Sequence, residues 1–277
     1  MTKMMSKNII HFFDLDGTLW RTDAKWWVVD KENATEPLMK ISQEEGSLIC
    51  GGFYKKYNYA ISYNGIDGWL SPKIYQKLCV NKRITLDRLG LSFREFHEKE
   101  YLDEQAESLT FLIEHIEHLK DSKDTIALLT ARGSRELHDK MLDKLKEKMD
   151  EHKLNLDIEK LYFVNDENLA RHDGLSHERK VAVIIEHIVG YRVRDNRFYP
   201  IQQESYDEIH FYDDEDRNVK HCLEINEIIS SMLTLTDFQL AEDIREHLTE
   251  NEVKLHVHKI TNNKVNPFTS NTIIIEI

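Results

Sequence analysis

Short apolar runs that stop at acidic or hydroxyl residues recur along the chain, and amphipathic segments separate them. Runs of this kind predict strands that are buried on both faces. They lie at 11–13, 126–129 and 209–212. Further strands are expected at 161–164 and 253–260, and 271–277 is either an edge strand or disordered. Helical spacing predicts helices over 104–120, 134–151, 219–233 and 236–248, with another opening near residue 177. This alternation is typical of an α/β fold with a mostly parallel central sheet.

The segment 21–100 differs from this pattern, because it is longer than a strand-helix-strand crossover requires. Its aromatic and β-branched residues predict short strands or a hairpin in 47–54 and 57–65, and helices are expected over 71–79 and 92–101. We therefore predict a core of residues 1–20 and 101–277 with an inserted mixed α/β cap at 21–100. Aromatic residues in such an insertion either stack on a flat substrate or form its small core. They are Trp26, Trp27, Tyr54 and Trp69.

Two carboxylates one residue apart end the first apolar run. Asp14 and Asp16 precede Gly17, where a strand can turn and aim both side chains into one cleft. Ligands of open α/β sheets bind at that edge. Close carboxylates repel each other unless a cation or a shared proton compensates, so this stretch predicts a hard divalent metal, Mg²⁺.

The stretch Asp-Leu-Asp-Gly-Thr-Leu at 14–19 resembles the first motif of the haloacid dehalogenase superfamily, whose members are mostly Mg²⁺-dependent phosphatases with a Rossmann-like three-layer core. Three later segments are similar to its other motifs in the right order. Thr130 ends a strand, Lys180 opens an amphipathic helix, and Asp214 and Asn218 follow the strand at 209–212 in an Asp-Asp-x-x-x-Asn pattern. Order and context make this resemblance specific, because each motif falls at an expected end of a strand or helix.

The resemblance implies a role for each of these residues. Asp14 is expected to be the nucleophile and Asp16 the general acid and base. Mg²⁺ would be held by Asp14, the backbone carbonyl of Asp16, and Asp214. Two sets of residues complete the expected site: Thr130, Arg132 and Lys180 would bind the phosphate, and Asp213 and Asn218 would position Lys180 or the metal ligands.

Several assignments have competitors in the sequence. Arg179 is adjacent to Lys180 and projects about 100° away on a helix, so only one of them can face the acids. The register within Asp213–Asp216 is open, since Glu215-Asp216-Arg217 can be aligned with the motif instead. Thr130 can also cap the following helix. Three arginines at 192, 194 and 197 indicate either a phosphate-tracking site or a solvated hairpin.

The substrate class is suggested by a narrower likeness. Asp-Asp-Glu-Asp-Arg-Asn at 213–218 and Thr-Ala-Arg-Gly at 130–133 resemble the phosphatase domain of polynucleotide kinase-phosphatases and RNA-repair relatives. A nucleotide or polynucleotide end is therefore the expected substrate, although the sequence has no Gly-x-x-x-x-Gly-Lys-Ser/Thr loop for a kinase. A small-metabolite phosphatase and a catalytically silent binding module are the alternatives.

Composition restricts the expected partners. The formal net charge of −13 over 277 residues argues against an extended nucleic-acid surface or an anionic membrane as partner. The three cysteines have no metal-ligand spacing, and no run of 18 apolar residues or secretory signal is apparent. We expect reduced thiols and a cytoplasmic location.

Overall fold

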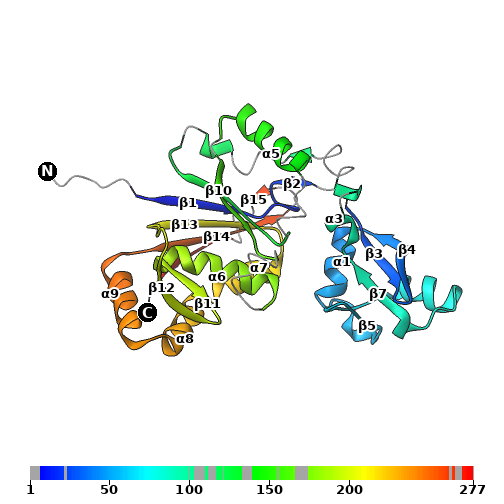
Figure 1. Cartoon of the computed structure of the whole chain (residues 1–277). Coiled ribbons are helices and arrows are strands. Elements are labelled where there is room, and N and C mark those ends of the chain that lie inside the picture. Colours follow the sequence, from blue (N-terminus) through cyan, green and yellow to red (C-terminus); the bar gives the residue numbers. More distant parts are fainter. Residues whose placement is uncertain are drawn as a thin grey trace. The chain divides into compact units, whose positions relative to one another are not determined.

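The computed structural model divides the chain into two compact units (Figure 1). One unit comprises Met1–Thr22 and Leu109–Ile277, and the other comprises Asp23–Ser108. The domain prediction had its divisions at 20/21 and 100/101. The residues described are 7–21, 24–98, 100–102, 110–111, 117–120, 122–132, 139–154, 156–165, 174–261, 264–265 and 270–276.

The larger unit is built on a mostly parallel sheet with β1 near its centre (Figure 1). Neighbouring strands follow the order β10-β9-β1-β13-β14, all parallel, and β15 and β16 pair with β14 in the antiparallel sense. The predicted α/β class and the mostly parallel sheet are confirmed. The strands are β1 (Ile9–Phe13), β9 (Thr125–Thr130), β10 (Leu156–Phe163), β13 (Glu208–Asp213), β14 (Lys254–Thr261), β15 (Lys264–Val265) and β16 (Asn271–Ile274).

Helices cover both faces of this sheet, with α5 on the side opposite α6 (Figure 1). Successive side chains of a strand point to opposite faces, so every second residue faces α6–α9. Phe12, Phe211 and Val257, on three neighbouring strands, pack with these helices in one hydrophobic core. The elements are α5 (Asp139–Glu151), α6 (Ser176–Val189), α7 (Asp216–Leu223), α8 (Ile225–Leu235) and α9 (Phe238–Glu250), with the hairpin β11 (Tyr191–Arg194) and β12 (Arg197–Gln202). Within the part of the chain that the structure describes, no helix is both long and apolar enough to cross a bilayer.

The smaller unit has its own core, in which Val28, Leu70 and Leu91 are fully buried. A three-stranded antiparallel sheet has the order β4-β3-β7, and a separate hairpin joins β5 and β6. A π-helical turn at Gln76–Asn81 continues α2, so the predicted helix over 71–79 is confirmed. The elements are β3 (Trp26–Asp30), β4 (Asn33–Ile41), α1 (Gln43–Cys50), β5 (Ala60–Tyr63), β6 (Ile66–Trp69), α2 (Pro72–Tyr75), β7 (Leu89–Ser92) and α3 (Arg94–His97).

One strand of the smaller unit was not predicted, and one prediction was wrong. The stretch 33–41 is the edge strand β4, which pairs with β3 on one side only and whose residues other than Ile41 are exposed or partly buried. Residues 43–50, expected to be extended from 47 onward, form α1. Ser42 caps this helix by accepting a hydrogen bond from Glu45 N at 3.2 Å, and the buried Ile49 anchors it.

The prediction of a helix over 104–120 is also wrong for the residues of this range that the structure describes. Thr110–Phe111 form the short strand β8, paired with β2 (Trp20–Arg21), and Glu117–Leu119 form a 3₁₀ turn. The rest of that prediction lies outside the described residues.

Candidate active site

Asp14 follows the last residue of β1 and lies at the carboxyl edge of the sheet. Its backbone N donates to Tyr212 O on β13 at 2.9 Å, and its side chain is buried. The chain then turns at Gly17, whose φ is +82°. A Cβ at Gly17 would lie 2.3 Å from Asp214 Oδ2, so only glycine permits both the turn and this close approach.

Lys180 brings its ammonium group to the acidic residues from the first turns of α6. Its Nζ lies 2.8 Å from Asp14 Oδ1 and 2.7 Å from Asp213 Oδ2, and the residue is 1% exposed. Arg179, the competing cation, instead donates to the backbone carbonyl of Val164 at 3.1 Å. Of the two candidates, Lys180 is therefore the one that contacts Asp14.

The last acidic motif supplies two carboxylates with different surroundings. Asp213 is fully buried and both its oxygens are engaged: Oδ1 accepts from Glu215 N, and Oδ2 accepts from Lys180 and from Asn218 Nδ2, each at 2.7–2.8 Å. Asp214 is exposed, and its Oδ1 lies 3.5 Å from Thr18 Oγ1. In this register Asp213 supports Lys180, whereas Asp214 remains open to a ligand.

The electrostatics of this cluster favour a cation. Burial raises the pKa of Asp14 well above its usual value, and the carboxylates of Asp213 and Asp214 add to the rise while Lys180 opposes it. Atoms packed around the Asp214 carboxyl remove part of its hydration and, with the Asp213 charge second, raise its pKa to about 7, although the residue keeps an exposed side. Burial would lower the pKa of Lys180, but its two acidic partners more than offset this and raise it.

The donor set fits a hard divalent cation. Carboxylate oxygens of Asp14, Asp213 and Asp214 lie within 4.8 Å of one another. When all three carboxylates are ionised, the single positive charge of Lys180 leaves a net charge of −2 in the cluster. Because both oxygens of Asp213 already accept hydrogen bonds, Asp14 Oδ2 and the Asp214 carboxylate are the oxygens available to a metal. Oxygen-only ligands of this type suit Mg²⁺.

Asp16 and Arg132 form an ion pair that the sequence did not predict. Arg132 donates from Nε and Nη2 to the two carboxylate oxygens of Asp16, both at 2.7 Å, and Arg132 is 3% exposed. Thr130, at the end of β9, accepts a hydrogen bond from Arg132 N at 3.2 Å. The expected acid-base residue and the expected phosphate ligand thus bind each other in this structure.

Two residues at the site were missed by the sequence analysis. Thr18 is fully buried beside Asp214, and it belongs to the same Asp-x-Asp-Gly-Thr stretch as the predicted residues. Lys259 is paired in register with Asp213, its Nζ donates to the backbone carbonyl of Asp214, and it lies 3.1 Å from Asp216. A lysine at the end of a predicted strand, where neighbouring strands carry acids, was the available signal.

The aromatic residues that were considered for stacking on a substrate lie in the smaller unit and pack largely against its own core. Trp27 is 1% exposed, and its Nε1 donates to Glu95 Oε1 at 2.8 Å. Trp26 and Tyr54 are partly buried against the core of this unit, and Trp69 is half-buried. The small-core interpretation is confirmed for Trp27, which has almost no surface left for a ligand.

The arginines of the β11–β12 hairpin lie on a solvated turn. Arg194 and Arg197 are exposed at its turn, and Arg194 lies 3.6 Å from the carboxylate of Asp195. The interpretation as a solvated hairpin is confirmed. Comparisons of the chain with protein-family models, with curated proteins and with solved structures find no match, so the function must be inferred from the residues and geometry of this site.

Proposed function

We propose that the larger unit is a Mg²⁺-dependent phosphohydrolase that cleaves phosphate monoesters through a phosphoryl group carried on Asp14. The observation that carries this proposal is the buried ammonium of Lys180 between Asp14 and Asp213, with the Asp214 carboxylate within reach. Phosphoryl transfer is limited by charge repulsion, and catalysis depends mainly on positioning and on neutralising the phosphoryl oxygens. The cluster combines a positioned nucleophile with fixed positive charge.

The proposed reaction has two steps on Asp14. A carboxylate oxygen of Asp14 attacks phosphorus, the bond from phosphorus to the ester oxygen breaks, and Asp16 gives that oxygen a proton. A water molecule then attacks phosphorus and gives a proton to Asp16, and the bond to Asp14 breaks to release inorganic phosphate. Lys180 holds the Asp14 carboxylate in place and offsets charge on the phosphoryl group in both steps.

Asp14 and Asp214, with the backbone carbonyl of Asp16, are the proposed ligands of Mg²⁺, which supplies polarisation of the phosphoryl group when bound. Asp213 and Asn218 are assigned to hold Lys180, in keeping with their hydrogen bonds. The close packing of Gly17 against Asp214 supports this division of roles, because it fixes the open carboxylate beside the turn that carries Asp14 and Asp16.

The Asp16–Arg132 pair must open during this cycle. Arg132 contacts both oxygens of Asp16 and so fixes the direction in which this carboxylate points, whereas passing a proton to an ester oxygen requires the carboxylate to turn toward the substrate. An arriving phosphate dianion attracts the same guanidinium, since Arg binds phosphate and carboxylate with the same two-pronged geometry. We assign Arg132 and Thr130 to phosphate binding, with Asp16 released as substrate enters.

We propose a nucleotide or a polynucleotide end as the substrate, on the likeness of the 130–133 and 213–218 segments to RNA-repair phosphatases. A phosphate-release screen with Mg²⁺ over nucleoside monophosphates, 3′-phosphorylated oligonucleotides and sugar phosphates tests this. Activity is expected on the first two classes and should be lost in Asp14→Asn. Activity confined to sugar phosphates would indicate a metabolite phosphatase. An Asp14→Asn variant as active as the wild type would refute the nucleophile, and no release from any substrate would favour a binding module.

A further inference from the structure

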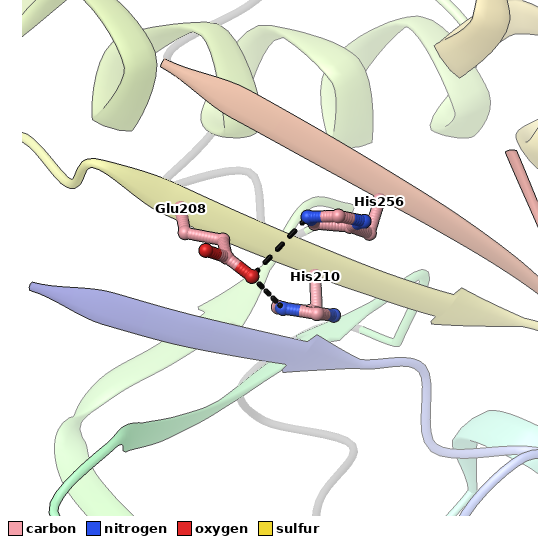
Figure 2. Close-up of side chains that lie close together, drawn as sticks. All are labelled: Glu208, His210 and His256. Carbon is pink, nitrogen blue, oxygen red and sulfur yellow. Dashed lines mark hydrogen bonds and ion pairs between the residues drawn. The ribbon is translucent and has the colours of Figure 1, made fainter. Parts of the chain in front are cut away.

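The face of the sheet opposite α6 carries a row of histidines around one glutamate. Because side chains alternate along a strand, Glu208 and His210 on β13 point to the same face. His256 on β14 is paired in register with His210 and lies beside it on that face (Figure 2). This cluster of Glu208, His210 and His256 takes no part in the proposed reaction.

The three side chains bring three ligand atoms within 4.8 Å of one another. Glu208 Oε1 lies 3.1 Å from His210 Nε2 and 3.2 Å from His256 Nε2, and the two rings stack with centroids 4.4 Å apart (Figure 2). Zinc bonds to imidazole nitrogen and carboxylate oxygen are about 2.0–2.2 Å long, so ligands at tetrahedral angles lie roughly 3.3 Å apart. The separations of Oε1 from the two nitrogens are close to that value.

The far side of each ligand is held by another polar group. His256 Nδ1 lies 2.9 Å from Thr272 Oγ1, and His210 Nδ1 lies 3.0 Å from His258 Nε2. The second carboxylate oxygen of Glu208 accepts a hydrogen bond from Lys7. Such outer contacts orient the rings of metal-binding histidines and fix which nitrogen faces the metal. Here they hold both Nε2 atoms beside Oε1. Because the two stacked rings are only 12° from parallel, one ring must tilt for both nitrogens to face the same ion.

One atom of the cluster is left without a hydrogen bond. His256 Nε2 is buried and has no hydrogen-bond partner, although a carboxylate oxygen lies 3.2 Å away. His210 Nε2, by contrast, is in hydrogen-bonding position to Glu208. A buried polar atom without a partner is costly, and a cation bound next to Oε1 would give His256 Nε2 a partner.

We propose that Glu208, His210 and His256 bind Zn²⁺ and that this ion braces β13 to β14. Two imidazole nitrogens and one carboxylate oxygen are a ligand set that zinc uses, with a fourth position open to solvent. The site is separate from the acidic cluster: Glu208 and Asp213 are at opposite ends of β13, roughly 17 Å apart at ~3.3 Å per residue, and their side chains point to opposite faces.

Zinc titration of the metal-stripped, untagged full chain in excess Mg²⁺, against a chelating dye, tests the proposal. We expect one Zn²⁺ per chain, a rise in the unfolding temperature on binding, and tetrahedral Co²⁺ absorption when Co²⁺ replaces Zn²⁺. His256→Gln should weaken Zn²⁺ binding by on the order of 100-fold or more, and Thr272→Val by roughly 10- to 100-fold. His247→Gln, on α9, should bind as the wild type does.

Several results would overturn this site. One is a wild-type chain that is folded and binds no stoichiometric Zn²⁺. Another is a folded His256→Gln variant that binds with unchanged affinity, and a third is binding that Asp14→Asn removes while His256→Gln retains it, which would locate the ion at the acidic cluster. If His256→Gln does not fold, the exposed Thr272 decides, because Thr272→Val leaves all three ligands in place and unchanged affinity in it contradicts the proposal.

Discussion

Replacing Lys180 by methionine removes the positive charge at the centre of the proposed site while keeping most of the side-chain volume. Lys180 is 1% exposed and holds two carboxylates at 2.7 and 2.8 Å. Removing one partner of a buried ion pair costs about 3–5 kcal/mol, because a charge remains without compensation. At ~2–4 °C per kcal/mol for a unit of this size, the unfolding temperature should fall by roughly 6–20 °C.

Lys160 provides a matched control for this experiment. Its Nζ also lies between two carboxylates, 3.0 Å from Asp157 and 2.8 Å from Glu204, but all three side chains are accessible to solvent. Lys160→Met should therefore cost at most about 1 kcal/mol. Both variants are measured by thermal and chemical unfolding, without metal and with Mg²⁺.

Mg²⁺ should recover more stability in Lys180→Met than in the wild type, since the acidic cluster then lacks its internal cation. Phosphate release should nevertheless stay low, because Asp14 has lost the group that orients it. Equal losses in Lys180→Met and Lys160→Met, or a Lys180→Met variant with wild-type stability and activity, would refute this reasoning.

Three further predictions concern single residues. Gly17→Ala should lower the unfolding free energy by at least ~1 kcal/mol, because φ at this position is +82°. It should also lower the rate of phosphate release by about 100-fold, because the new Cβ displaces Asp214. Unchanged kinetics would contradict the proposed role of Asp214. Asp16→Asn should slow turnover by ~10²–10⁴-fold yet still allow Asp14 to be phosphorylated by p-nitrophenyl phosphate, whose leaving group needs no proton; mass spectrometry of the quenched protein decides. Trp27→Phe should cost about 1–3 kcal/mol of stability, because Glu95 loses a buried partner, while KM is unchanged; a raised KM would return Trp27 to a substrate role.

Much of the sheet could be predicted because its strands carry their own signal. Strand β9 is an apolar run between two threonines, β1 is apolar apart from His11, and β13 carries apolar residues on the face that packs with the helices. Burial of that face against the helices requires such residues. The strand β4 could not be found in this way, since an edge strand with one paired side has no need of apolar residues. Its pairing with β3 is a tertiary contact that the residues of 33–41 do not encode locally.

The candidate site shows the same division. Asp14, Lys180 and Asp213 meet because three separate segments each end at one edge of the sheet, and the order of motifs predicted those positions. The pairing of Arg132 with Asp16 depends on side-chain reach across neighbouring strands, which spacing along the chain does not give.

The histidine cluster also had a local signal that was not used. Glu208-x-His210 and His256-x-His258 place polar residues at every second position of two predicted strands. That spacing indicates one polar face on each strand. It cannot indicate that the two strands are neighbours, so the convergence of Glu208, His210 and His256 depends on the sheet order.

The most direct test of the central claim is to look for a phosphoryl group on Asp14. The chain is mixed with Mg²⁺ and a substrate found in the screen, quenched in acid within one turnover, digested and analysed by mass spectrometry. We predict one phosphoryl group on the peptide that contains Asp14, with none in Asp14→Asn. Phosphate release that proceeds with no phosphorylated peptide at any quench time, or with the phosphoryl group on another residue, would contradict the account.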